Sequence, residues 1–198
     1  MASQSSSDKM TARDAVMVGA LGAVIIVIRF ALMIAGGLGP YVWFSSHFVD
    51  ALLIGPVFML VMSKVRKPGA FLIISVVTGL VFVEATWMIL VTGIVGGLLC
   101  ELFAKRADYR PGALATAAFC FFNLGFIGDF LPLYLTKEQY FATAMTQMPQ
   151  AYVDQLYALI SAPVLALIVA SVIVGSILGA LFGARMMRRH FARVAPAK

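Results

Sequence analysis

The chain has 198 residues, of which 62% are hydrophobic and only 12% are charged. A soluble domain of this length is about half apolar and about a quarter charged, so the composition excludes a water-soluble globular protein and indicates a membrane protein. The net charge of +6 alone would suit nucleic-acid binding, but the positions of the basic residues, described below, exclude it.

The N-terminal segment MASQSSSDKMTARD, residues 1–14, is polar and is expected to form a cytoplasmic tail. An apolar run follows from Ala15 to Gly37 and contains a single charged residue, Arg29. This run is too long for the core of a cleaved signal peptide, and further apolar runs follow it. We therefore interpret it as a retained first helix.

The apolar runs predict an all-α integral membrane protein, a six-transmembrane-helix bundle over residues 15–184. A helix needs about 20 apolar residues to cross a bilayer core of about 30 Å, and its backbone groups must be paired within the helix. The expected spans are residues 15–36, 47–64, 69–84, 86–104, 112–131 and 157–184. The third span is short, and its junction with the fourth is either a tight turn at Glu84–Ala85 or a broken helix.

The basic residues set the orientation of these spans. All of them except Arg29 and Lys137 fall in the N-terminal tail, in the loops KVRKPG and KRADYR, and in the C-terminal tail, residues 185–198. Lys and Arg accumulate in cytoplasmic segments, so both termini are predicted to be cytoplasmic. Anionic lipids are the natural partners of basic residues at a membrane rim, which excludes nucleic acid as a partner.

One outer loop, from about Pro132 to Tyr157, is long. Thr136 and Gln139 have the spacing of a capping box, which is typical of a short interfacial helix. Such a helix could lie over the mouth of the bundle; a plain connector is the alternative.

Charged side chains inside membrane spans are costly and normally face the bundle interior or a water-filled cavity. Most of the candidates here fall toward the outer side, together with aromatic residues. We therefore predict an outward-opening pocket with Arg29 at its floor and aromatic walls. The candidate substrate-binding residues are Arg29, Trp43, His47, Asp50, Glu84, Trp87, Asn123 and Asp129. Glu101 lies near the cytoplasmic end, where a surface pairing with Lys105 and Arg106 is expected.

Arg29 has two competing interpretations, which do not exclude each other. It pairs with an acid such as Asp50 or Glu84 to hold helices together, or it holds an anionic or hydrogen-bond-accepting group of a ligand in its planar fork. A proton relay is less favoured because arginine does not titrate usefully.

Small residues recur every four positions in two helices. Ala15, Gly19 and Ala23 form a smooth stripe on the first helix, on a face about 80° away from Arg29. The last span repeats the pattern at Ser171, Gly175, Gly179 and Gly183. Such stripes let helices approach closely. We favour packing within the bundle for the last span, although docking of another membrane protein would also fit.

Motifs for catalysis are missing from the chain. It has no phosphate-binding loop, no HExxH and no GxSxG elbow, so we expect neither ATP hydrolysis nor another enzymatic activity. His47 and His190 are not at metal-ligand spacing from Cys100 or Cys120, and both cysteines fall in apolar runs as expected for buried thiols. We therefore expect no metal site and no cofactor.

The segments MTARDAVMVGALGAV, LLIGPVFMLVMSKVRKPGA and GIVGGLLCELFAKRADYR together resemble the MptD (Trep_Strep) group of substrate-binding S components of energy-coupling factor (ECF) transporters. The resemblance runs in order to about Arg110 and is weaker in the fifth and sixth spans. It implies a six-helix protein of the bacterial cytoplasmic (inner) membrane that captures a vitamin or another small micronutrient from outside. A planar, hydrogen-bonding molecule would suit Arg29 and the aromatic residues.

The resemblance also implies partners: a membrane coupling subunit and two ATPase subunits of an ECF module. The stripe Ala15, Gly19 and Ala23 matches the position of the family's docking motif, although Gly19 departs from an all-alanine version. A stand-alone proton-coupled secondary transporter is the alternative function, with Asp50, Glu84 or Asp129 as the relay. The sequence shows no internal repeat of the kind that many carriers have, and this counts against the alternative. A membrane enzyme is a further rival, which no motif supports.

Overall fold

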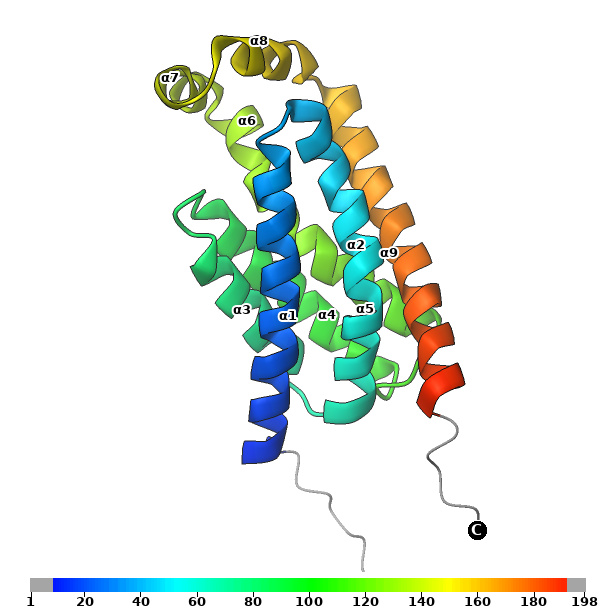
Figure 1. The fold of residues 1–198 in the computed structure, drawn as a ribbon. Coiled ribbons are helices and arrows are strands. Elements are labelled where there is room, and N and C mark those ends of the chain that lie inside the picture. Colours follow the sequence, from blue (N-terminus) through cyan, green and yellow to red (C-terminus); the bar gives the residue numbers. More distant parts are fainter. Residues whose placement is uncertain (1–8, 192–198) are drawn as a thin grey trace, which may run out of the picture.

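The computed structural model describes residues 9–191, and every regular element in that range is a helix (Figure 1). The elements are α1 (Ala12–Gly36), α2 (Pro40–Val65), α3 (Ala70–Val81), α4 (Met88–Arg106), α5 (Ala113–Leu124), the 3₁₀ helix η1 (Gly125–Asp129), α6 (Leu131–Leu135), α7 (Lys137–Gln147), α8 (Gln150–Leu159) and α9 (Ala162–Phe191).

Within the described residues, four helices are long and apolar enough to cross a membrane: α1, α2, α4 and the part of α9 over Ala162–Arg189. Two further apolar segments, α3 and the continuous stretch Ala113–Asp129, are shorter. These observations confirm the predicted all-α membrane protein.

Several helices begin or end at other residues than predicted. Thr11 caps α1: its hydroxyl accepts from the Asp14 amide, while the Asp14 carboxylate accepts from the Thr11 amide, so α1 begins at Ala12. Pro40 occupies the first turn of α2, which therefore starts well before residue 47. The last helix, α9, begins at Ala162 instead of residue 157, and it runs past residue 184 to Phe191, into the predicted C-terminal tail. Residues 1–8 and 192–198 of the two predicted tails lie outside the described residues.

In the part of the chain that the structure describes, six helices pack in a closed ring. The order around the ring is α1, α2, α9, α5, α4, α3 and back to α1. The start of α1 and the end of α9 lie at one end of this bundle, and α7 and α8 lie at the other (Figure 1).

Glycines bring α2 and α9 into backbone contact. A Cβ atom added to Gly179 would collide with the carbonyl oxygen of Ala51, and one added to Gly183 would lie 2.6 Å from the carbonyl oxygen of Gly55. The small-residue stripe of α9 therefore packs against α2 within the bundle, which is the interpretation favoured from the sequence.

The stripe on α1 has the opposite environment. Ala15, Gly19 and Ala23 are all exposed, and nothing lies within 4 Å of a Cβ added to Gly19. Arg29 is only 3% exposed, so it lies on the inner face of the same helix. The structure confirms that one helix carries two different faces.

Two apolar clusters fill the interior of the bundle. The larger one contains Phe58, Phe71, Phe119 and Phe122 and lies toward the end where α1 begins. The smaller cluster contains Phe130, Leu133, Phe141 and Leu156 and lies beneath α7 and α8. A layer of buried polar side chains separates the two clusters on α1, α2, α5 and α9: Arg29, Asp50, Asn123 and Ser176.

The predicted interfacial loop folds as α6, α7 and α8. Phe141 of α7 and Leu156 of α8 are buried against the smaller apolar cluster, and the Tyr152 hydroxyl donates to the carbonyl of Gly36 at 3.2 Å. These helices therefore cover the end of the bundle next to the polar layer, and the alternative of a plain connector is wrong.

Candidate functional site

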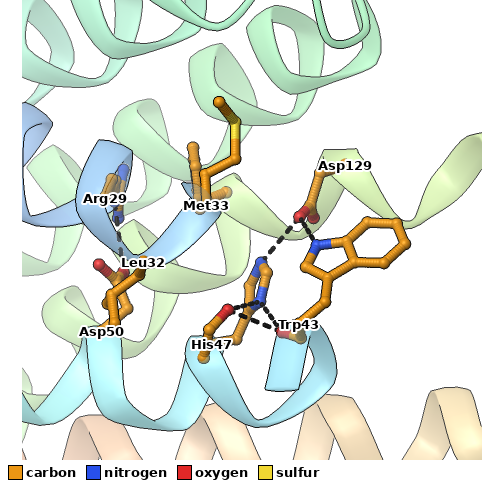
Figure 2. Close-up of a pocket in the computed structure, with 9 residues that line it drawn as sticks. Arg29, Leu32, Met33, Trp43, His47, Asp50 and Asp129 are labelled. Carbon is orange, nitrogen blue, oxygen red and sulfur yellow. Dashed lines mark hydrogen bonds and ion pairs between the residues drawn. The ribbon is translucent and has the colours of Figure 1, made fainter. Parts of the chain in front are cut away.

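A pocket opens between α1, α2 and η1, at the boundary of the polar layer and the smaller apolar cluster (Figure 2). Its free space is about 290 Å³ when the open side is included. The lining residues are Arg29, Leu32, Met33, Trp43, Ser46, His47, Asp50, Phe126 and Asp129. The enclosed part is only about 20 Å³, enough for about one water molecule, so a larger ligand requires the open side to widen.

Helix periodicity aims the side chains of α2 into this pocket. Trp43, His47 and Asp50 are spaced by four and three residues, so they share one face of the helix. Only Gly37, Leu38 and Gly39 separate α1 from α2, and this short connection places the C-terminal half of α1, including Arg29, alongside that face.

The tight winding of η1 places the remaining wall. In a 3₁₀ helix, residues three apart eclipse each other, so Phe126 and Asp129 point to the same side. Thr92 of α4 fixes the back of this segment by donating a hydrogen bond of 2.7 Å to the carbonyl of Gly125. A Cβ on Gly128 would collide with the Thr92 hydroxyl, so only glycine lets η1 lie this close to α4.

Arg29 connects three helices through its guanidinium group. Its Nε donates to Asp50 Oδ2 at 3.3 Å and its Nη2 donates to Asn123 Oδ1 at 3.3 Å. The Cζ atom lies 4.2 Å from the ring centre of Phe126 and 5.0 Å from that of Phe122, which adds cation–π contacts. Asn123 extends the network by donating to Ser176 Oγ on α9 at 2.9 Å.

Asp129 forms a second polar group with two side chains of α2. The indole Nε1 of Trp43 donates to Asp129 Oδ2 at 3.1 Å, and His47 Nε2 lies 3.1 Å from the same oxygen (Figure 2). The His47 ring packs 4.4 Å from the ring of Phe130 and stacks on Phe126 at 5.8 Å. The walls next to this group are therefore aromatic.

Three polar atoms of the pocket are buried and lack a hydrogen-bond partner among the described residues. They are Asp50 Oδ1, Asp129 Oδ1 and His47 Nε2. The His47 nitrogen is close to Asp129, but its alignment is too poor for a hydrogen bond. Buried polar atoms are nearly always paired in native proteins, so a further hydrogen-bonding group, from water or a ligand, is expected at these atoms.

Three predicted site residues do not line the pocket. Asn123 accepts a hydrogen bond from Arg29 but is not part of the lining, and Glu84 and Trp87 lie elsewhere. Glu84 is exposed in the turn between α3 and α4, and Trp87, at the start of α4, is 62% exposed. Neither lines the pocket, because α3 ends at Val81 and the turn after it leads the chain away from α1 and α2.

Other residues of the site have no sequence motif. Leu32, Met33 and Ser46 join the pocket only through the register of α1 and α2. The spacing of Asn123, Phe126 and Asp129 by three residues is the one signal that could have identified Phe126.

Glu101 has a different role from the predicted surface pairing. Its Oε1 accepts from the backbone amides of Phe71 and Leu72 at 2.6 and 3.3 Å. The first amides of a helix lack partners within the helix, so Glu101 caps the start of α3 from the neighbouring helix α4.

No group of three or more His, Cys, Asp or Glu side chains that could hold a metal ion occurs in the described part of the chain. Cys100 is buried, Cys120 is half-buried, and the two are not joined in a disulfide.

Residues 12–193 match a family model described as "Hypothetical bacterial integral membrane protein (Trep_Strep)". Comparison with curated proteins and with solved structures gave no match.

Proposed function

Because the chain belongs to the Trep_Strep family of bacterial integral membrane proteins, we propose that it is the substrate-binding S component of an ECF-type ABC importer. In this proposal, the pocket between α1, α2 and η1 captures a small vitamin-like or heterocyclic micronutrient from outside the cell. The observation that carries the proposal is a pocket in the apolar interior of the bundle that is lined by polar side chains. Some of their buried atoms have no hydrogen-bond partner among the described residues. Ionisable groups at such depth are costly, and they mark functional sites in membrane proteins.

The proposed topology has six spans in the bacterial cytoplasmic membrane, with both termini in the cytoplasm. Two features support it. The ring order places the short helix α3 between α1 and α4, and α5 between α4 and α9, so each is flanked by helices long enough to span. The basic residues after α2, after α4 and at the end of α9 belong to one side of the membrane by the positive-inside rule. The pocket, near α7 and α8, then opens outward.

The proposed partners are a membrane coupling subunit and two ATPase subunits, which supply the energy that this chain has no motif to extract. The proposed docking surface is the exposed stripe of Ala15, Gly19 and Ala23, whose flatness suits close approach of another helix. The role is binding and delivery, without catalysis.

A stand-alone proton-coupled transporter is the second candidate. The observation in its favour is the buried contact between His47 and Asp129, two titratable groups in one pocket. Both candidate functions use the same binding pocket. They differ in the energy source, which is ATP hydrolysis by partner subunits in one and a proton gradient in the other, and in whether partner subunits are needed.

Co-purification tests the proposal. The protein is extracted gently from its own host and its companions are identified by native mass spectrometry. We expect a coupling subunit and two ATPase subunits to accompany the unmodified protein and to be lost from Gly19→Leu, which puts bulk on the stripe.

Ala31→Leu is the matched control, since Ala31 is a small exposed residue of the same helix outside the stripe. Retention of the partners by Gly19→Leu would remove the stripe from the interface. A solitary unmodified protein would favour the proton-coupled transporter.

A further inference from the structure

We propose that the ligand of the pocket carries a protonated amine or amidine group next to a flat ring. This inference rests on the proposed binding role of the pocket and names the chemical class of what it binds. It departs from the idea that Arg29 receives an anionic group.

The first step is the use that the protein already makes of Arg29. Its side chain is 2% exposed, and its guanidinium donates to Asp50 on one side and to Asn123 on another. The positive charge is thus opposed by a carboxylate at 3.3 Å and lies against the Phe126 ring. An anion entering the pocket would meet a neutralised arginine.

The second step is the surplus of acceptors. Asp50 is 5% exposed, and while its Oδ2 accepts from Arg29, its Oδ1 is buried without a partner among the described residues. Asp129 has the same arrangement. Its Oδ2 accepts from Trp43, and its Oδ1 is buried without a hydrogen-bond partner among the described residues. Both residues line the one pocket.

A carboxylate oxygen buried without a donor is unfavourable, and an N–H donor that carries a positive charge satisfies it best. The fixed charges around the pocket agree with this assignment. Arg29 and Asp50 cancel, which leaves Asp129 opposed only by His47. The pocket is therefore negative when His47 is neutral and neutral when His47 is protonated, but not positive.

The third step is the shape of the walls. Trp43, His47 and Phe126 line the same pocket as the two carboxylates. Aromatic faces favour flat ligands and also attract a cationic group. A planar cation with N–H donors would suit both the carboxylates and the aromatic residues of the pocket.

Three probes of one shape test the charge preference: benzamidine, benzamide and benzoate carry a cationic, a neutral and an anionic head on the same ring. The protein is used as the full chain in lipid nanodiscs with Trp87→Phe, which leaves Trp43 of the pocket as the only tryptophan. Trp43 fluorescence is recorded during titration with each probe through the millimolar range. We expect saturable binding of benzamidine with a Kd at least about tenfold lower than that of the other two, because a charge-assisted hydrogen bond contributes that much.

Asp129→Asn provides the second measurement. It removes the charge but keeps the shape, so we expect benzamidine affinity to fall at least about tenfold. Asp154→Asn on α8 is the matched control, since Asp154 is an exposed carboxylate outside the pocket, and it should leave binding unchanged. Equal affinities for the three probes, a preference for benzoate, no saturable signal from benzamidine, or an unaltered Asp129→Asn would each overturn the inference.

These outcomes are separate from those of the co-purification test. A protein that prefers benzoate but retains its ATPase partners remains an S component with a ligand of another class. One that prefers benzamidine but has no partners is a binder of cations without the proposed importer role.

Discussion

Arg29 and Asp50 form a buried ion pair with almost no exposure to solvent. The Arg29 side chain is 2% exposed and that of Asp50 is 7% exposed. Removing both charges of such a pair is often tolerated, but removing one leaves an uncompensated buried charge. The cost of a single substitution therefore measures the charge left behind rather than the net value of the pair.

We predict that Arg29→Met lowers the free energy of unfolding by about 3–5 kcal/mol, because it strands the Asp50 carboxylate in the bundle. Adding Asp50→Asn should restore part of this stability, although Asp50→Asn alone also destabilises the protein. Thermal unfolding in detergent of the two single variants and the double variant gives the comparison. A double variant as unstable as the sum of the two single losses would show that the two side chains act independently.

At the level of residues, the sequence identified much of the pocket. Charges and amides are rare inside apolar runs, so Arg29, Asp50, Asn123 and Asp129 were conspicuous. Arg29, Asp50 and Asp129 line the pocket, whereas Asn123 only supports Arg29 through a hydrogen bond. Glu84 is equally polar, but it lies in a turn after α3 that exposes it, and no pattern separates a span end from such a turn. Leu32 and Met33 were missed because apolar residues look the same whether they face a pocket or lipid.

Gly179 of α9 and Gly19 of α1 show that the packing around a helical glycine decides its effect on stability. Gly179 lies against the Ala51 carbonyl, whereas Gly19, in a helix of similar composition, faces open space. Glycine in a helix costs about 1 kcal/mol relative to alanine unless close packing requires it. The same substitution should then have opposite effects at the two positions.

We predict that Gly179→Ala destabilises the protein by about 1–3 kcal/mol, since the added methyl group forces α2 and α9 apart. Gly19→Ala should be neutral or raise stability by up to about 1 kcal/mol through helix propensity alone. Unfolding midpoints of both variants in the same detergent check this. The packing of α2 on α9 would be contradicted if Gly179→Ala were as stable as Gly19→Ala.

A second prediction at this scale concerns the short helix α3, whose first amides are capped by Glu101 of α4. Glu101→Ala should cost about 1–2 kcal/mol, the usual value for a lost helix cap, and should increase hydrogen exchange at Phe71 and Leu72. Glu101→Gln keeps one acceptor oxygen and should lose less. Hydrogen exchange with mass spectrometry localises the effect, and unchanged protection of those two amides in Glu101→Ala would remove Glu101 from the capping role.

The helices themselves were largely predictable, because their apolar runs are long; their ends were less so. Pro40 and Gly39 are ordinary signals for a helix start, but the apolar and aromatic residues that follow them directly hide the boundary. The change from α5 to the 3₁₀ helix η1 depends on Gly125 and Gly128 fitting against α4, which is a tertiary contact. Such contacts leave no periodic pattern in the sequence.

At the scale of the molecule, the direction of α4 decides between two topologies. If only the four long helices crossed the membrane, α4 would have to end outside, although in the bundle its last turns lie beside the start of α3, at the end where α1 begins. If α3 and the Ala113–Asp129 segment also cross, α4 ends in the cytoplasm with its basic residues Lys105 and Arg106. The charges favour the second arrangement.

Gly112 reports on this choice. It lies in the exposed loop between α4 and α5, has an extended φ of 168°, and has nothing within 4 Å of an added Cβ, so Gly112→Cys should be tolerated. In a background with Cys100 and Cys120 replaced by alanine, we predict that a membrane-impermeant maleimide labels Gln150→Cys on intact cells but leaves Gly112→Cys unlabelled. Permeabilised cells should give labelling at both positions, which controls for accessibility of the thiol. Gln150 is the first residue of α8, at the end of the bundle opposite the start of α1 (Figure 1), and is predicted to be outside the cell, whereas Gly112 is predicted to be inside. Labelling of Gly112→Cys on intact cells would contradict the predicted six-span topology and, with it, the direction of α4 in the bundle.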